Sequence, residues 1–242
     1  MRQLLYCVLN SSNMEGDLHV IGVGDKPVEF LRGSGLCAAI SGVEGPEIPF
    51  DVNSMITYHR VIENFFERGA IIPFRFRTLF NDEKEVIAML EQNNDNYTKL
   101  LSKLDGMVEM GIRLVKAKPL NVDSPQVDTE FSGASDVSSP GMSYLKKRWA
   151  LYSSESWIQD QKKEFSEKCS KEFDGLFANF KSEASRLPEV QNNKNLILIS
   201  LYFLVRKDLI QEFRVKFREL KCLITGKMLL SGPWPPYNFV VS

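Results

Sequence analysis

Few side chains in this 242-residue sequence could support acid–base or nucleophilic chemistry. His19 and His59 are the two histidines, and imidazole is the side chain whose charge changes most readily near neutral pH. His19 lies in an apparent strand, and His59 lies one residue off the apolar stripe of a predicted helix. Glu109 and Arg113 fall on one face of another predicted strand, which favours pairing across strands or between domains. We therefore favour structural or solvent-facing roles for all four.

The spacings typical of metal, nucleotide and hydrolase sites do not occur in the sequence. It holds no HExxH, CxxC or GxSxG motif and no carboxylate-rich calcium loop. The glycines of GSGLCAAISG, residues 33–42, lack the spacing of a phosphate loop and predict a tight turn between strands. We expect no catalytic residue, no cofactor and no metal, and thus a protein that is not an enzyme.

The cysteines, the net charge and the lengths of the apolar runs predict where in the cell the protein is located. Four cysteines lie far apart among apolar residues, which predicts buried free thiols in a reducing cytoplasm; they are Cys7, Cys37, Cys169 and Cys222. A net charge of −1 gives no reason to expect nucleic-acid or membrane-surface binding. The apolar run after Gln3 is too short for a signal-peptide core, and no window approaches the ~20 apolar residues of a membrane span. We expect a cytoplasmic protein without a membrane span.

The first half predicts a mixed α+β unit. Short apolar runs indicate strands, and a spacing of three and four residues from Met55 to Phe65 indicates an amphipathic helix, capped by Asp51 or Asn53 and ending near Gly69. A further helical stripe follows an extended segment. The expected elements are strands at 4–9, 18–23, 27–31 and 36–43, the helix from 51, the extended segment at 70–80 and one helix over 86–104.

The second half predicts the order strand, long helix, strand, helix, strand. These elements are a strand at 107–117, a helix from Tyr144 whose stripe runs to Leu187 before Pro188, a strand at 195–205, a helix at 209–220 and a strand at 222–230. Residues 118–139 are rich in Ser, Asp and Pro and predict a flexible loop. The order suits a ferredoxin-like sheet with a helical extension. We therefore expect an α+β fold of two domains, residues 1–105 and 106–230, with a tail at 231–242.

Two aromatic-rich segments are the candidates for contacts with a partner or between domains. In PFRFRTLF, Phe and Arg alternate, which on a strand places the aromatics on one side; an amphipathic edge strand and a recognition edge remain alternatives. The tail SGPWPPYNFV predicts a stiff segment close to polyproline II. We favour docking of the tail on its own protein over partner binding, because an exposed apolar tail promotes aggregation. The candidate residues are Phe74, Arg75, Phe76, Arg77, Trp234, Pro235, Pro236, Tyr237 and Phe239.

Several segments in order along nearly the whole chain resemble the gas vesicle protein F/L family. They are LLYCVL, GLCAAISGV, HRVIENF with AIIPFRFRTLF, LDGMVEMGIRLV, PGMSYLKKR and, most specifically, SGPWPPYNFV. The family usually has a glycine where this chain has Arg77, and residues 118–139 have no clear family character.

The resemblance implies an accessory or minor structural protein of gas vesicles. Such a protein binds the small hydrophobic shell protein and other accessory proteins during assembly, and it is located in the cytoplasm and with the vesicle. The implied fold has two α+β domains, the second a modified ferredoxin fold, with the C-terminal tail packed between them. The alternative function is a ferredoxin-like module that senses a small ligand, and an enzyme is the third possibility.

Overall fold

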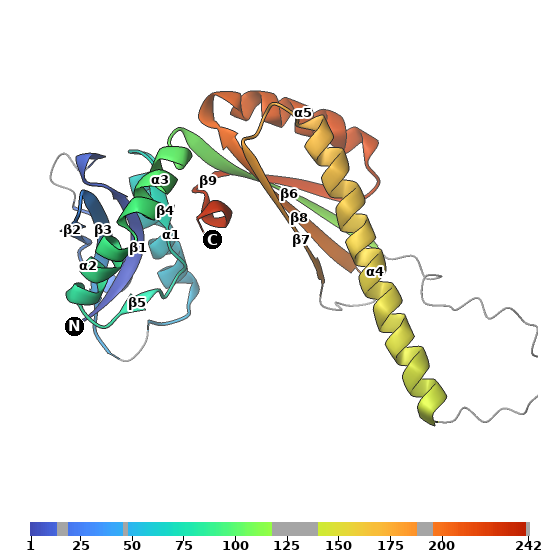
Figure 1. The fold of residues 1–242 in the computed structure, drawn as a ribbon, viewed down its shortest axis with the longest axis horizontal. Helices are drawn as coiled ribbons and strands as arrows, with labels where there is room; N and C mark the ends of the chain where they lie inside the picture. Colours follow the sequence, from blue (N-terminus) through green and yellow to red (C-terminus); the bar gives the residue numbers. More distant parts are fainter. Residues whose placement is uncertain (14–18, 46–47, 118–139, 188–195, 241–242) are drawn as a thin grey trace, which may run out of the picture. The chain divides into compact units, whose positions relative to one another are not determined.

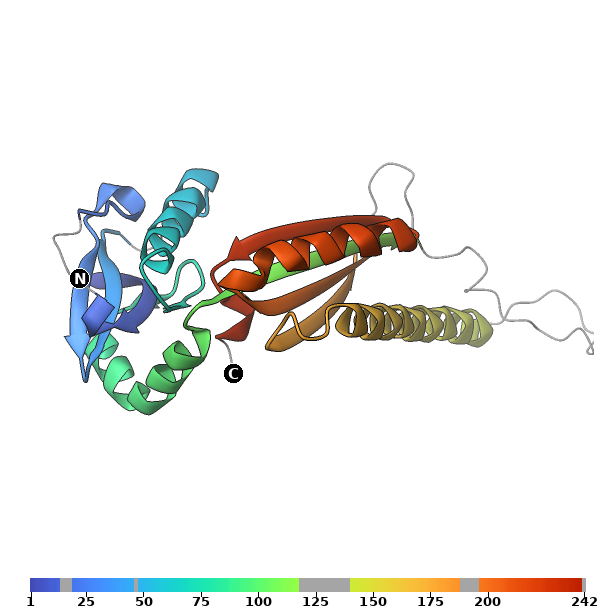
Figure 2. The same ribbon diagram turned by 90° about the horizontal axis from the view of Figure 1, so that it is seen from above.

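The computed structural model describes residues 1–13, 19–45, 48–117, 140–187 and 196–240 (Figures 1 and 2). These residues form a mixed α+β structure with two antiparallel sheets and five α-helices. The chain divides into two compact units. Unit 1 comprises Met1–Met110, Leu204–Ile210 and Ser231–Ser242, and unit 2 comprises Gly111–Phe203 and Gln211–Leu230.

The sheet of unit 1 is built around a first strand that is buried on both faces. Its strands lie in the order β2-β3-β1-β4, and β5 also pairs with β1. A bulge between Leu5 and Cys7 shifts the alternation of side chains along β1. Helices cover both faces, which is why the LLYCVL run is continuously apolar rather than alternating. The strands are β1 (Arg2–Asn10), β2 (Glu29–Gly33), β3 (Leu36–Val43), β4 (Ile71–Pro73) and β5 (Leu79–Phe80).

Three helices supply the two cores of unit 1 (Figure 1). Helix α1 (Val52–Phe66) packs Tyr58, Ile62 and Phe65 against one face of the sheet. Helices α2 (Glu83–Gln92) and α3 (Asn94–Leu104) cover the other face with Val86, Leu90, Leu101 and Leu104. Asp51 caps α1, because its Oδ1 accepts the Ser54 backbone N–H at 2.9 Å, so the predicted start of this helix is confirmed.

The single helix predicted over 86–104 is wrong, because the chain breaks at Asn93. There φ and ψ are −106° and 10°, and both the backbone N–H and the side-chain amide of Asn93 donate to the Met89 carbonyl. An Asn side chain that binds the last turn in this way closes one helix before the next begins. The strand predicted at 18–23 is also wrong where the structure describes it, since Ile21 forms only an isolated bridge with Pro27. Instead, Val23–Asp25 form a short 3₁₀ turn, with Gly22 before it and Gly24 within it.

The second sheet has the strand order β7-β8-β6-β9, and its connections include α4 (Pro140–Glu172) and α5 (Ile210–Leu223). The long helix predicted to reach Leu187 is wrong, because α4 ends at Glu172 and Gly175 follows with φ +79°. Phe177 and Phe180 continue the helical spacing of apolar residues although they lie beyond the end of α4. Both rings contact Phe203, which also contacts Phe173, so the spacing reflects packing in one aromatic cluster. The strands are β6 (Met107–Ala117), β7 (Asn179–Arg186), β8 (Leu196–Arg206) and β9 (Lys227–Trp234).

Other differences concern the end of α5 and the segments outside the described residues. The strand predicted at 222–230 begins only at Lys227, since Cys222 lies in the last turn of α5. Cys222 is exposed, which contradicts its predicted burial, whereas Cys7, Cys37 and Cys169 are buried as expected. The predicted loop at 118–139 and the predicted helix stop at Pro188 lie outside the described residues.

Candidate interaction site

The C-terminal tail belongs to unit 1 and is held there by side chains from distant parts of the sequence. Strand β9 runs to Trp234, Pro235 and Pro236 are buried, and Tyr237–Phe239 form a 3₁₀ turn. This turn departs from the extended conformation predicted for the tail. Gly232 has φ +103°, and a Cβ placed on it would lie 2.6 Å from the Glu109 carbonyl oxygen, so the tail approaches β6 more closely than a side chain allows.

A buried carboxylate binds the tail backbone. Glu109 on β6 is only 4% exposed, and its Oε2 accepts the Asn238 backbone N–H at 2.8 Å. The Asn238 side-chain amide donates to Oε1 of the same carboxylate at 2.6 Å. Both carboxyl oxygens of this buried group thus accept hydrogen bonds from the tail, and leaving a buried polar group without its partners is costly. Glu109 therefore fixes the position of the 3₁₀ turn that ends the described tail.

His59 on α1 makes a second attachment to the tail. Its Nδ1 lies 3.1 Å from the Tyr237 hydroxyl, and its Nε2 lies 3.2 Å from Oε1 of Glu63. The His59 ring also lies beside the indole of Trp234, with the ring centroids 5.6 Å apart. His59 thus contacts two aromatic residues of the tail, while His19 is exposed. Burial raises the pKa of the Tyr237 hydroxyl, and the nearby Cys7, Glu63 and Glu109 raise it further.

The PFRFRTLF segment forms a turn between β4 and β5 rather than one strand. The Thr78 N–H and hydroxyl both donate to the Arg75 carbonyl, at 3.1 and 2.7 Å, and Arg77 has φ +72°. The prediction that Phe74 and Phe76 face the same way is therefore wrong. Phe74 packs with Tyr97 against the α2–α3 side of the sheet, whereas Phe76 packs on the α1 side.

Tyr58 of α1 lies beneath this turn. Its hydroxyl donates to the Leu5 carbonyl at 2.8 Å and lies 3.1 and 3.2 Å from the carbonyl oxygens of Phe74 and Arg75. Its ring contacts that of Phe76, with centroids 5.3 Å apart. Burial raises the Tyr58 pKa, so the hydroxyl stays protonated and continues to donate. Sequence reasoning identified Tyr58 only as a member of an apolar stripe.

A groove separates the turn from the tail. Its volume is about 390 Å³, and it brings together the predicted residues Phe74, Arg75 and Tyr237. The remaining lining residues are Ile72, Pro73, Thr78, Tyr97, Asn238 and Val240. Phe239 instead packs against the core on the α2–α3 side, and Trp234 is 38% exposed. The predicted residues therefore divide into groove, core and surface positions, all within unit 1.

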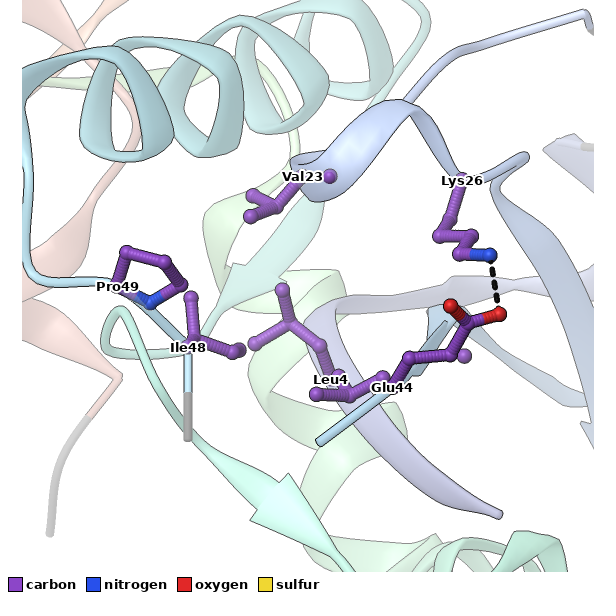
Figure 3. Close-up of a pocket in the computed structure, with 9 residues that line it drawn as sticks. Leu4, Val23, Lys26, Glu44, Ile48 and Pro49 are labelled. Atoms are coloured by element: carbon purple, nitrogen blue, oxygen red, sulfur yellow. Dashed lines mark hydrogen bonds and ion pairs between the residues drawn. The ribbon is translucent and has the colours of Figure 1, made fainter. Parts of the chain in front are cut away.

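A smaller cavity of about 170 Å³ lies near the N-terminal strand (Figure 3). Leu4, Val23 and Ile48 line it, and an ion pair joins Lys26 Nζ to Glu44 Oε1 at 2.6 Å. Ligand pockets usually measure roughly 300–1,000 Å³, so this cavity offers little support for a metabolite site. Within the described ranges, no group of three or more His, Cys, Asp or Glu residues is placed to hold a metal ion. No helix in those ranges is long and apolar enough to cross a membrane.

Sequence and structure comparisons converge on one family. The family described as "Gas vesicle synthesis protein GvpL/GvpF" matches residues 3–241. Gas vesicle protein L of Streptomyces sp. (strain CB03234) is 24% identical over 241 residues, which cover 90% of this chain and 85% of that protein. Gas vesicle protein F of the same strain is also 24% identical, over 99% of this chain and 100% of that protein.

Two crystal structures share the fold at low sequence identity. GvpF from Microcystis aeruginosa superimposes with a TM-score of 0.69 at 14% identity, over 100% of this chain and 99% of the other. GvpF from Anabaena sp. PCC7120 gives 0.65 at 13% identity, over 100% and 96% of the two chains. Because the family match spans almost every residue of the sequence, the chain belongs to the gas vesicle GvpL/GvpF family.

Proposed function

We propose that this chain is an accessory or minor structural protein of gas vesicles that binds the small shell protein and other accessory proteins during vesicle assembly. Family membership supports the gas vesicle role. The observation that carries the binding role is the exposure of Trp234: the tail around it is anchored by Glu109 and His59, yet the indole remains 38% exposed. A large aromatic group held in place at a surface is typical of a protein-binding residue.

The proposal includes a cellular location and a finer description of the fold. The protein acts in the cytoplasm and at the vesicle, without catalysis. Residues 106–230 form a ferredoxin-like domain, residues 1–105 form the N-terminal domain, and residues 231–242 form the C-terminal tail. The strand order β7-β8-β6-β9 supports the ferredoxin-like description, because four strands and two helices in this order make a split βαβ sheet.

Co-expression with the small shell protein, followed by affinity capture through a tag on this chain, tests the function. The full chain is compared with a chain truncated after Leu230, and the melting temperature of each is measured. Capture by the full chain is the expected result. Loss of capture on truncation with unchanged melting makes the tail a direct contact, whereas loss together with lower melting makes it an internal clasp. If the full chain captures neither the shell protein nor another vesicle protein, the proposed function is wrong.

A further inference from the structure

Strand β7 lies at one edge of the second sheet, and β8 is its neighbour on the inner side (Figure 1). Within the residues that the structure describes, no strand pairs with the outer side of β7. The strand is eight residues long, and its side chains are alternately exposed and half-buried from Asn179 to Ser185. An edge strand of this length presents a row of backbone donors and acceptors to which another strand can bind.

The alternation of the backbone determines which residues of β7 face the open edge. The Leu187 N–H donates to the Leu196 carbonyl at 3.0 Å, and in an antiparallel pair only every second residue bonds to the same neighbour. The odd-numbered residues of β7 therefore bond to β8, and the even-numbered ones direct their N–H and carbonyl groups outward. The Phe180 N–H fits this pattern, because it donates to the side-chain Oδ1 of Asn179 at 2.7 Å.

The charges along the exposed face of β7 are complementary to one another. Lys181 and Glu183 are exposed on the same face, on either side of Ser182. When two copies of β7 pair antiparallel around Ser182, Lys181 of each copy lies directly opposite Glu183 of the other. These residues form the non-hydrogen-bonded pairs across the edge, in which side chains come closest. Opposite charges in such a pair stabilise it, whereas like charges destabilise it.

One register satisfies both the backbone and the charges. A two-fold axis at Ser182 pairs the outward-facing residues with one another along most of the strand. An axis at Lys181 or at Glu183 places two like charges directly opposite each other. An axis nearer either end of β7 leaves much of the strand unpaired. The sequence of β7 therefore favours pairing with an identical strand, centred on Ser182.

A hollow on the α4 side of this edge leaves room for the second strand. In the register centred on Ser182, Ala184 of the second copy falls opposite Phe180, so a small side chain meets a large one. Arg186 of the second copy falls opposite position 178, at the end of β7 that follows Asp174. The hollow has a volume of about 470 Å³ and is lined by two carboxylates, one ammonium group and three uncharged residues: Ser166, Glu167, Ser170, Lys171, Asp174 and Phe180.

We infer that two copies of this chain associate by antiparallel pairing of β7 with β7, about a two-fold axis at Ser182, so that their four-stranded sheets join into one. Charged side chains on an edge strand normally hinder pairing with unrelated strands. Here the same charges permit pairing with a second copy and oppose the neighbouring registers. The inference goes beyond the proposed function and does not depend on it.

Sedimentation velocity of the full chain over a series of concentrations measures this association, and we expect a reversible dimer. Lys181→Glu and Glu183→Lys each place like charges opposite each other at both symmetric pairs. Each should raise the dimer dissociation constant by roughly tenfold, most strongly at low salt. The chain with both substitutions has opposite charges again and should dimerise like the parent. A mixture of the two single variants should form mixed dimers, because one copy then carries two carboxylates and the other two ammonium groups.

Two matched controls reverse exposed charges on other edge strands. Lys227→Glu on β9 and Glu29→Lys on β2 change the net charge equally and should leave the dissociation constant unchanged. Circular dichroism and melting establish that each variant is folded, which separates loss of contact from loss of structure. A parent chain that stays monomeric at about 100 µM would overturn the inference. A dimer that neither Lys181→Glu nor Glu183→Lys weakens would overturn it as well.

A cysteine at the two-fold axis tests the register. Ser182→Cys is made together with Cys222→Ser, because Cys222 is an exposed native thiol. The Cα atoms of a hydrogen-bonded antiparallel pair lie about 5.5 Å apart, which a disulfide can span, so oxidation with diamide should link two copies. Ser185→Cys in the same background places the two thiols roughly 20 Å apart along the paired strands and should not link them. Linkage through residue 185 and not through residue 182 would contradict the pairing around Ser182.

Discussion

Arg77 adopts a left-handed backbone conformation, with φ +72°, in the turn between β4 and β5. A residue with a Cβ is disfavoured there by about 1 kcal/mol, whereas glycine is not. A glycine at this position would therefore suit the geometry that this chain keeps with arginine. We expect Arg77→Gly to raise the free energy of unfolding by about 0.5–1 kcal/mol in urea titrations, after the greater flexibility of glycine in the unfolded chain is included. Arg77→Ala, which keeps the Cβ, should give no such gain, and equal stability of the two variants would contradict the explanation.

Two buried tyrosines and one that is half-buried make the protein sensitive to alkali. Burial raises the pKa of Tyr6, Tyr58 and Tyr237 above the ordinary value of 10.0. Above that pH the unfolded chain loses these protons before the folded chain does, so the unfolded state binds fewer protons and stability falls as pH rises. Their contribution is fully present below pH 10, and the three buried thiols, whose ordinary pKa is lower, begin the decline in stability at about pH 9.

The tyrosine effect is tested by urea unfolding of the parent and of Tyr237→Phe at several values between pH 8 and pH 11. The variant lacks the proton that Tyr237 retains in the folded state, so its stability should fall less steeply above pH 10. Below pH 9 the two slopes should agree. A variant whose slope above pH 10 equals that of the parent would show that Tyr237 does not contribute.

The four cysteines should differ sharply in reactivity. Burial raises the pKa of Cys37 to about 11 and that of Cys169 to about 12, and it raises that of Cys7 as well. Only the thiolate attacks a disulfide reagent, so these three should be inert at pH 8 in the folded protein. We expect Ellman's reagent to modify one thiol rapidly, and none in Cys222→Ser. Rapid reaction of a second thiol in the folded protein would mean that one of the buried cysteines is accessible.

At the scale of elements, the tail is held by the pair Glu109 and Asn238. Removing either partner leaves the other group buried without a full set of hydrogen bonds. We expect Asn238→Ala to lower the free energy of unfolding by about 1–3 kcal/mol, the range for leaving a buried polar group without its hydrogen-bond partner. In a double-mutant cycle with Glu109→Ala, the coupling energy should be clearly favourable. Additive effects of the two substitutions would show that the carboxylate and the tail are energetically independent.

Elements with one strong period were predictable from sequence, whereas their interruptions were not. The apolar stripe of α1 indicates an amphipathic helix, and the continuous apolar runs of β1 and β8 indicate buried strands. In contrast, Phe177 and Phe180 keep a helical spacing although they lie beyond the end of α4. The two rings contact each other, and Phe177 contacts Phe203, so both residues are apolar because they pack in one aromatic cluster. Asn93 ends α2 through a hydrogen bond of its own side chain, which leaves no periodic signal.

Of the residues at the candidate site, only those in the aromatic and proline-rich segments were predicted from the sequence. Aromatic and proline-rich segments stand out in composition, so the β4–β5 turn and the tail were identified as candidates. The polar groups that attach the tail carry no local motif: Glu109 lies 129 residues before Asn238, and His59 lies 178 residues before Tyr237. Such pairs are fixed by the tertiary fold. The one signal that could have found Glu109 is its place among apolar residues in a strand, where a buried carboxylate needs partners.

At the scale of the whole molecule, low net charge and an exposed apolar surface act together. The sequence has a net charge of −1 and an isoelectric point near 6.2, so mutual repulsion between copies is weak around neutral pH. Val52, Met55 and Ile56 on the outer face of α1 are exposed, so contact between copies at this face removes apolar side chains from water. We expect light scattering of the purified chain to show more self-association at pH 6.2 than at pH 8.5.

Two lysine variants distinguish the effect of the exposed apolar face on self-association from the effect of net charge. Ile56→Lys and Val215→Lys raise the net charge equally, but only the first interrupts the exposed apolar face of α1. If that surface drives self-association, Ile56→Lys should reduce scattering well below the value for Val215→Lys at the same pH and salt concentration. Equal reductions would assign the effect to net charge alone. A larger effect of Ile56→Lys would show that the exposed apolar side chains, rather than net charge, limit the solubility of the free chain.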